Sequence, residues 1–314
     1  MPTARETLVQ ALAAYDVRGA TLADVPAATA VICAAEEAIW GEAEMVPDDV
    51  AEAWARPSID LADDVVLVVD DGRVVAIAEV YRGRGEGYVH PSHRGRGIGT
   101  ALVEWWTARA GEHGYRTAGQ TVCDDDTTAV ALLRGLGCSE GHTSWILDYP
   151  LTGTRPEPAR APLGIDLRLL QPGEERALFH LIDEAFSHWE DREPGIYEDW
   201  AATTIDAPSW EPWRGVVAVD GSDLVGAALL RRYPGEGWVD QIAVARRTAG
   251  AASGARCWST RSPRSGARSR ASACPPTRAR ARSICTCTSA CGCAGRTGGC
   301  AGRPASPAEP RGAR

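Results

Sequence analysis

An internal repeat limits this chain to folds that can be built twice. The segment VVLVVDDGRVVAIAEVY (65–81) predicts two strands joined by an Asp-Asp-Gly turn, and VVAVDGSDLVGAALL (216–230) repeats that strand pair. GEGYVH (85–90) returns as GEGWVD (235–240) at the same offset of 150 residues. The same order of strands therefore occurs in both halves, and we expect a duplicated domain.

The first copy alternates strands and helices over residues 15–151. Apolar spacing predicts helices at 23–41, 48–56, 100–114 and 127–137, and strands at 65–81, 86–91, 117–123 and 144–151. A linker rich in Pro and Gly follows at 152–164. The second copy, 165–246, is predicted to be truncated after its fourth strand. We expect an α/β (α+β) fold in which helices flank a mixed central sheet.

The composition changes abruptly near residue 247. Of the 42 acidic residues only Glu309 lies beyond Arg246, whereas 13 of the 33 basic residues do. The tail, 247–314, has no Leu, Val, Phe, Met or Tyr, so it cannot bury enough apolar surface to offset the entropy lost on ordering. We therefore predict a disordered tail. The acidic body disfavours nucleic acid as a partner.

Seven of the ten cysteines lie in this tail, four of them in CTCTSACGC (285–293). Structural zinc sites usually pair Cys-x2-Cys units across a folded stretch, and this segment has Cys-x-Cys spacing instead. The arginines of TRARARS (277–283), earlier in the tail, would suit nucleic-acid phosphates, but no interleaved aromatic residues accompany them. We predict no metal site here.

A shifted reading frame is the third interpretation of the tail, and it is the one we favour. A one-base shift near Arg247 permits HRGRGLGRALL, which restores HRGRGIGTALV of the first copy where the repeat requires it. We expect an extra or missing base within the codons for residues 245–250.

The sequence offers no membrane or export signal. No run of eighteen apolar residues occurs, and the first residues lack the apolar core of a signal peptide. We expect a cytoplasmic protein with no membrane partner.

The segment SHRGRGIG (92–99) carries the clearest chemistry. It joins a predicted strand to a predicted helix and has three glycines at spacing two. Glycine lets the backbone approach a ligand closely, and the free N–H groups at a helix start favour an anion. Arg94 and Arg96 add charge suited to phosphate oxygens, so we predict pyrophosphate binding. A dinucleotide fingerprint is the alternative, but it needs a strand-first unit and an acidic residue about 20 positions on.

Arg94, Gly97 and Gly99 fill the pattern Arg/Gln-x-x-Gly-x-Gly/Ala, and in this the chain resembles the GNAT acetyltransferase superfamily. The order of elements matches over residues 17–150 and in part over 165–246. The resemblance implies a splayed mixed sheet with acetyl-CoA in the V between strands four and five. The tandem layout, with EAFSHW and YEDW in the second copy, is similar to the mycothiol synthase branch.

The resemblance also implies which residues hold acetyl-CoA. Backbone groups of residues 88–90 would hold the pantetheine arm, and the amides of residues 95–100 would hold the pyrophosphate. The residues predicted in this way are Tyr88, Val89, His90, Arg94, Gly95, Arg96, Gly97, Ile98, Gly99 and Thr100. No metal is expected to take part.

The family pattern leaves the catalytic groups open. The family often places a Tyr in its distal helix to protonate the departing thiolate, whereas this chain has Leu133 there. Glu86, near the fourth strand, is a candidate base or a solvated strand-end charge. Asp240, on the fourth strand of the second copy, is a candidate base or the partner of a neighbouring arginine.

The predicted function is transfer of an acetyl group from acetyl-CoA to a primary amine of a small molecule or peptide, mainly by aligning the reactants. In the intact parent protein, with the reading frame restored, the second copy is expected to do the chemistry, and the first to be a binding or structural partner. The alternative is an acetyl-CoA-binding module without turnover, because Leu133 replaces the acid and the second site is lost. A nucleic-acid-binding protein is a third class and rests on the tail alone. We also expect residues 165–246 to be poorly stable in this chain, since their last strand is left unpaired.

Overall fold

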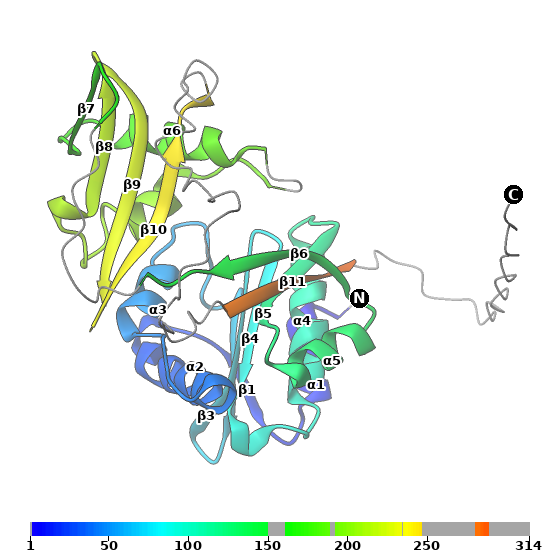
Figure 1. Cartoon of the computed structure of the whole chain (residues 1–314). Coiled ribbons are helices and arrows are strands. Elements are labelled where there is room, and N and C mark those ends of the chain that lie inside the picture. Colours follow the sequence, from blue (N-terminus) through cyan, green and yellow to red (C-terminus); the bar gives the residue numbers. More distant parts are fainter. Residues whose placement is uncertain (1, 150–160, 189–191, 234, 247–279, 289–314) are drawn as a thin grey trace, which may run out of the picture.

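Two units, each built on its own sheet, follow one another along the chain (Figure 1). The computed structural model describes residues 2–149, 161–188, 192–233, 235–246 and 280–288. The sheet of the first unit has the order β1-β2-β3-β4-β5-β11-β6, and that of the second has the order β10-β9-β8-β7. Helices flank both sheets, which confirms the predicted fold class.

The strands of the first unit lie between two helical layers. Its elements are α1 (Ala4–Ala11), β1 (Asp16–Gly19), η1 (Leu22–Asp24), α2 (Val25–Trp40), α3 (Pro47–Trp54), β2 (Val65–Asp70), β3 (Arg73–Tyr81), β4 (Arg84–Val89), η2 (Pro91–His93), α4 (Ile98–Glu112), β5 (Thr117–Cys123), α5 (Thr127–Gly135) and β6 (Ser139–Ile146).

Strand β2 shows why this sheet is covered on both faces. Successive side chains of a strand point to opposite faces. Val66 and Val68 pack with the α1 and α4 side, whereas Val65 and Leu67 pack with the α2 and α3 side. All four are fully buried, so an uninterrupted apolar run fits a strand with helices on both faces.

Helix α4 lies directly against the sheet, because Gly85 of β4 leaves room for Trp106. A Cβ at Gly85 would lie 2.4 Å from the Trp106 ring, so this contact requires glycine. On its other side α4 contacts α1, which places Leu8 in the same core. The structure thus adds α1 to the first unit, whose predicted first residue was 15.

Strands β4 and β5 separate soon after they meet. They are parallel and pair only at Arg84 and Gly119. Beyond this point the sheet opens on the side that leads to η2 and α4. This opening is the predicted V between the fourth and fifth strands.

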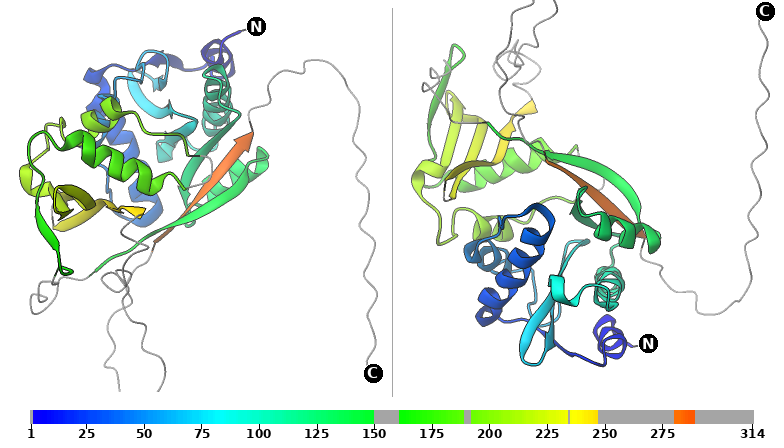
Figure 2. Two further views of the ribbon diagram at one scale, coloured as in Figure 1. Left: turned by 90° about the horizontal axis from the view of Figure 1, so that it is seen from above. Right: turned by 60° about the horizontal axis from the view of Figure 1, so that its bottom comes forward.

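Strand β11 (Arg280–Thr288) fills the place between β5 and β6 and is antiparallel to both (Figures 1 and 2). This differs from the prediction that the whole tail lacks regular structure. Both neighbouring strands offer open backbone groups at this gap, and the segment SICTCT within β11 is rich in residues that favour extended backbone. Residues 247–279 and 289–314 lie outside the described part of the chain.

The second unit is an antiparallel sheet with α6 against one face. Its elements are β7 (Ile165–Leu169), α6 (Glu175–Phe186), α7 (Tyr197–Thr203), η3 (Pro212–Arg214), β8 (Gly215–Asp220), β9 (Asp223–Tyr233) and β10 (Glu236–Val244). Leu178 and Ile182 of α6 pack on Val217 and Leu229 of the sheet. Among the described residues β10 is an edge strand, as the repeat predicted, and its Ile242 and other apolar side chains are exposed.

The two units contact each other through buried polar groups. Asp199 of α7 is 2% exposed and accepts hydrogen bonds from the Ser58 amide (3.0 Å), the Ser58 hydroxyl and the Tyr81 hydroxyl (2.9 Å). Arg82 donates to the Pro194 carbonyl at 2.7 Å. These contacts hold the second unit against α3 and the loops beside it.

Candidate active site

The glycine-rich loop makes a sharp entry into α4. Gly95 and Gly97 have φ angles of 74° and 80°, in the left-handed region that favours glycine, and Gly97 is the N-cap of α4. Since Ala101 donates the first helical hydrogen bond to the Gly97 carbonyl, the amides just before it have no acceptor in the helix. Free N–H groups at a helix start are the geometry that the predicted anion site requires.

Hydrogen bonds along η2 fix the approach to the loop. The His93 ring bonds to the Asp70 carboxylate at 2.9 Å and to the Ser92 hydroxyl at 2.8 Å. His90 bonds to the same hydroxyl at 2.8 Å, and Arg96 donates to the Ser92 carbonyl at 3.1 Å. The loop is therefore held to the end of β2 before α4 begins.

A cavity of about 300 Å³ occupies the opening between β4 and β5. Residues 87–89 of β4 and 120–123 of β5 form two of its walls, and α2, α4 and α5 contribute the others. Gln120 reaches across to donate to the Gly87 carbonyl at 3.3 Å, where the strands begin to separate. The cavity thus lies between the strand backbone and the glycine-rich loop.

The backbone of β4 presents free groups to this cavity. The His90 amide donates to the Val75 carbonyl of β3 at 2.9 Å. Because backbone groups alternate sides along an extended strand, the N–H and C=O of Val89 point away from β3. Val89 itself lines the cavity, so its backbone is available to a ligand there.

Most of the predicted acetyl-CoA residues meet at this cavity. Those that line it are Tyr88, Val89, Arg94, Gly95, Gly97, Gly99 and Thr100. The other predicted residues make different contacts: His90 and Arg96 bond to Ser92, and Ile98 is 1% exposed in the core. Their predicted roles in ligand binding remain predictions.

Two buried side chains that line the cavity are apolar or weakly polar. Leu133, which stands where the family pattern often has Tyr, is 1% exposed and lines the cavity. Cys123 also lines it as a free thiol that is 7% exposed. Among the described residues, no group of three His, Cys, Asp or Glu side chains could hold a metal ion.

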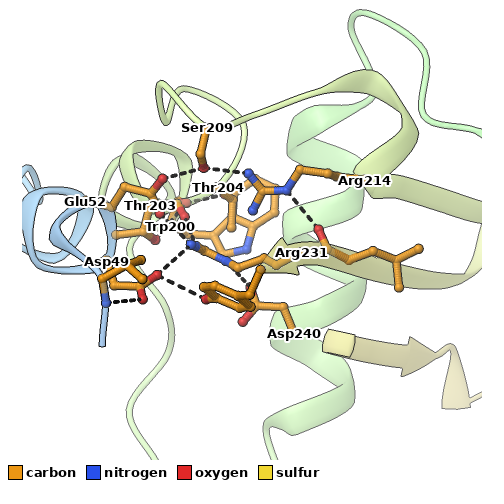
Figure 3. A network of polar contacts seen from close by, with 12 residues as sticks. Asp49, Glu52, Trp200, Thr203, Thr204, Ser209, Arg214, Arg231 and Asp240 are labelled. Atoms are coloured by element: carbon orange, nitrogen blue, oxygen red, sulfur yellow. Dashed lines mark hydrogen bonds and ion pairs between the residues drawn. The ribbon is translucent and has the colours of Figure 1, made fainter. Parts of the chain in front are cut away.

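Asp240 belongs to an ion network between the two units (Figure 3). Arg231 of β9 lies 3.5 Å from Asp240, 2.6 Å from Glu52 and 3.4 Å from Asp49, and it also donates to the Thr203 carbonyl at 2.8 Å. Burial lowers the pKa of Arg231, but the charges of Asp240 and Glu52 outweigh this effect and raise it. Asp240 thus has the neighbouring arginine partner that one interpretation expected, and its role as a base stays a prediction.

Glu86 lies outside the large cavity, on the α2 and α3 side of the sheet. It lines a second cavity of about 110 Å³ together with Glu79, Trp54 and Tyr88. Sequence analysis missed Glu79, although an acid within the apolar strand segment AIAEVY is a visible signal. It also missed Arg231, whose partners are distant in sequence.

The family comparison matches most of the first unit. Residues 31–138 match the model of the Acetyltransferase (GNAT) family. A mycothiol acetyltransferase of Thermobispora bispora is 32% identical over 130 residues, or 41% of each chain, and one of Streptomyces coelicolor is 31% identical over 163 residues, or 48% of each. The matched region thus covers less than half the length of each of these curated relatives.

Solved structures extend the likeness to both units. A GCN5-related N-acetyltransferase from Sphaerobacter thermophilus has 26% identity and a TM-score of 0.62, over 87% of this chain and 95% of that chain. A tandem GNAT protein from the clavulanic acid biosynthesis pathway shares the fold, with 19% identity and a TM-score of 0.51 over 76% of this chain and 82% of that chain. No described helix is long and apolar enough to cross a membrane. Residues 31–138 therefore match the acetyltransferase (GNAT) family, within a chain that has the fold of a tandem GNAT protein.

Proposed function

We propose that the first unit transfers the acetyl group of acetyl-CoA to a primary amine of a small molecule or peptide. The observation that carries this proposal is the cavity between β4 and β5, where the glycine-rich loop and the free backbone of β4 face the same space. A long ligand with a pyrophosphate at one end and an acyl chain at the other suits this arrangement.

The residues that would hold acetyl-CoA divide by chemistry. The free amides at the start of α4 and the Arg94 guanidinium suit the pyrophosphate. The backbone of Val89 suits the amide groups of the pantetheine arm, which then follows β4 as an added strand would. The buried apolar side chain of Leu133, which lines the cavity, suits the methyl of the acetyl group.

The chemical step then depends mainly on alignment of the amine with the thioester. The amine nitrogen attacks the acetyl carbon, a C–N bond forms and the C–S bond breaks. Two protons leave the ammonium form of the amine: a base takes one, and the other ends on the coenzyme A thiol. The relatives named mycothiol acetyltransferases make a mycothiol-type amine one candidate acceptor.

A second candidate function is acetyl-CoA binding without turnover. The specific observation in its favour is Leu133, a buried apolar residue at the place where the family pattern often has an acid for the leaving thiolate. In addition, Asp240 is held by Arg231.

Calorimetric titration with acetyl-CoA, followed by a thiol-release assay across a panel of primary amines, tests both functions. We expect binding and release of coenzyme A with at least one amine. Binding without thiol release would favour the second candidate, and absence of binding would overturn the proposal.

A matched pair of glycine variants assigns the binding to the loop. Gly97 and Gly114 both have positive φ, 80° and 87°, and a Cβ at either would meet no atom within 4 Å. Gly97→Ala and Gly114→Ala should each cost about 1 kcal/mol of stability. Only Gly97→Ala should weaken acetyl-CoA binding, by about tenfold, because it disturbs the amides at the start of α4. Equal affinities of the two variants would contradict a role for the loop.

A further inference from the structure

Helix α6 covers one face of the sheet in the second unit (Figure 1). Val217 and Leu229 point toward this helix, so the strand residues next to them point to the opposite face. We call that opposite face the open face, because the apolar side chains on it are exposed to solvent. The most exposed of them are Leu167 (56%), Leu169 (47%), Val239 (56%), Ile242 (43%) and Val244 (39%).

The strand register joins these side chains into one surface. Leu169 of β7 is paired with Val216 of β8, which is paired with Ala228 of β9. Ala228 is in turn paired with Ile242 of β10. Since paired residues lie on the same face of a sheet, this row crosses all four strands, and Leu167 begins a second row beside it. A contiguous apolar surface of this width marks an interaction site.

The first unit shows that the same face of its sheet is buried. The repeat offset of 150 residues relates Val66 to Val216 and Ala78 to Ala228. Val66 and Ala78 are paired in register, as are their counterparts. In the first unit α1 and α4 pack on this face, and Val66 and Ala78 are 0% and 1% exposed. The open face therefore has the residue pattern of a surface that is covered.

The remainder of the chain has too few apolar residues to cover the open face. Beyond Arg246 the sequence contains two large apolar residues, Trp258 and Ile284. Ile284 belongs to β11, where it is the partner of Thr121 in the sheet of the first unit. A single tryptophan cannot bury a surface that spans four strands, so the cover must come from another molecule.

The two ends of the open face carry opposite charges. Asp220, at the end of β8, lies on the same side of its strand as Ala218, at the turn into β9. Arg232 lies on the same side of β9 as Leu230, near the far end of that strand. Both charged side chains are exposed. A second copy turned end for end would place the Arg232 of each chain over the Asp220 of the other.

We propose that the open face is an interface between two copies of this chain, related by a two-fold axis that runs across the strands. Two sheets that pack face to face lie about 10 Å apart, with their strands within about 30° of each other. Four strands about 4.8 Å apart, over about five residues of about 3.3 Å each, give a footprint of roughly 300 Å². Two corrugated faces of this size bury on the order of 1,000 Å² of accessible surface, which is at the small end for a specific interface.

Sedimentation equilibrium of the full-length protein measures this association without any variant. The mass should rise from one chain to two between about 1 and 100 µM protein, with a dissociation constant of about 10 µM, because the interface is small. It should stop at two chains, since a two-fold interface uses the open face of both copies and closes.

A matched pair of leucine variants assigns the association to the open face. Leu167 on the open face and Leu22 in η1 of the first unit are similarly exposed, at 56% and 59%. Leu167→Glu should weaken the association by at least about a hundredfold, because the two-fold axis brings two unpaired carboxylates into the interface. Leu22→Glu adds the same charge elsewhere on the surface and should keep the wild-type dissociation constant. Circular dichroism checks that both variants are folded.

Charge reversal tests the end-for-end arrangement. Arg232→Asp should weaken the association by about tenfold, because it places like charges opposite each other, and adding Asp220→Arg should restore it. A double variant that associates as weakly as the single one would reject the two-fold arrangement. Three results would overturn the interface itself: a wild-type mass of one chain at about 100 µM, a mass that keeps rising beyond two chains, or equal dissociation constants for Leu167→Glu and the wild type.

Discussion

At the scale of single residues, the protonation of Glu79 couples stability to pH. Burial, and then the charge of Glu86, raise its pKa to about 7 in the folded protein, against an ordinary value of 4.5. The folded state therefore binds the extra proton between these values, and the free energy of unfolding falls as pH rises from 4.5 to 7. We expect this contribution to amount to about 2 kcal/mol, allowing for partial solvent contact.

The variant Glu79→Gln should lose this contribution to the pH dependence. Urea unfolding followed by circular dichroism at pH 5 and pH 7.5 would measure it, with Asp48→Asn as the control for removal of one charge. The stability of Glu79→Gln relative to the wild type should be higher at pH 7.5 than at pH 5. Parallel curves for the two proteins would show that Glu79 keeps an ordinary pKa.

Single residues also show what the sequence could predict about the site. Arg94, Gly97 and Gly99 were predicted because spacing along a loop is a local property, and the structure places all three at the cavity. Glu79 was missed because its position depends on its register with Glu86 and on Trp54, which comes from a helix 25 residues earlier in the sequence. Local patterns do not contain such cross-strand relations.

At the scale of elements, the contact between β9 of the second unit and α3 of the first depends on the guanidinium of Arg231. Arg231 is the ion-pair partner of Glu52, which is 4% exposed, so Arg231→Met would leave a buried carboxylate without its positive partner. We expect a loss of about 3 kcal/mol in the free energy of unfolding. Urea unfolding would measure it.

The neighbouring Arg232 provides the control for this variant. It is exposed and stacks over the Trp213 ring at 4.8 Å, so Arg232→Met should change stability by less than about 1 kcal/mol. Adding Glu52→Gln to Arg231→Met should recover part of the loss, because it removes the uncompensated charge. If the two arginine variants are equally stable, the network does not join the units.

Elements also differ in how well the sequence predicts them. The strands from β2 to β4 were predicted because their apolar runs and turns are continuous. The last strand of the first unit was predicted at 144–151, but β6 is Ser139–Ile146. The bounds of this strand are set by its hydrogen-bonded pairing with β11, and not by a run of buried apolar side chains that the sequence could reveal. Leu147 and Tyr149, which made the later segment look like a strand, are 77% and 76% exposed.

At the scale of the whole molecule, the two units should differ in stability. The described sheet of the second unit has four strands with β10 at one edge, whereas that of the first unit has seven strands and helices on both faces. Native-state hydrogen exchange should show β10 amides exchanging at least about tenfold faster than those of β2. Strand β9, which is inside the same sheet, is the internal control and should lie between them. Equal protection of β10 and β2 would contradict the prediction that residues 165–246 are poorly stable.

The pairing of β11 with β5 has a consequence for how the protein is made. Arg282 is the partner of Cys123, so the strand that closes the first sheet leaves the ribosome only after the whole second unit has been synthesised. Domains generally fold as they emerge, starting at the N-terminus. Here the first unit can begin folding early, but its sheet has an open gap beside β5 until residues 280–288 have been synthesised. During that interval the nascent chain presents an unpaired strand edge, so translation speed over the second unit sets how long a chaperone or a second chain has access to it.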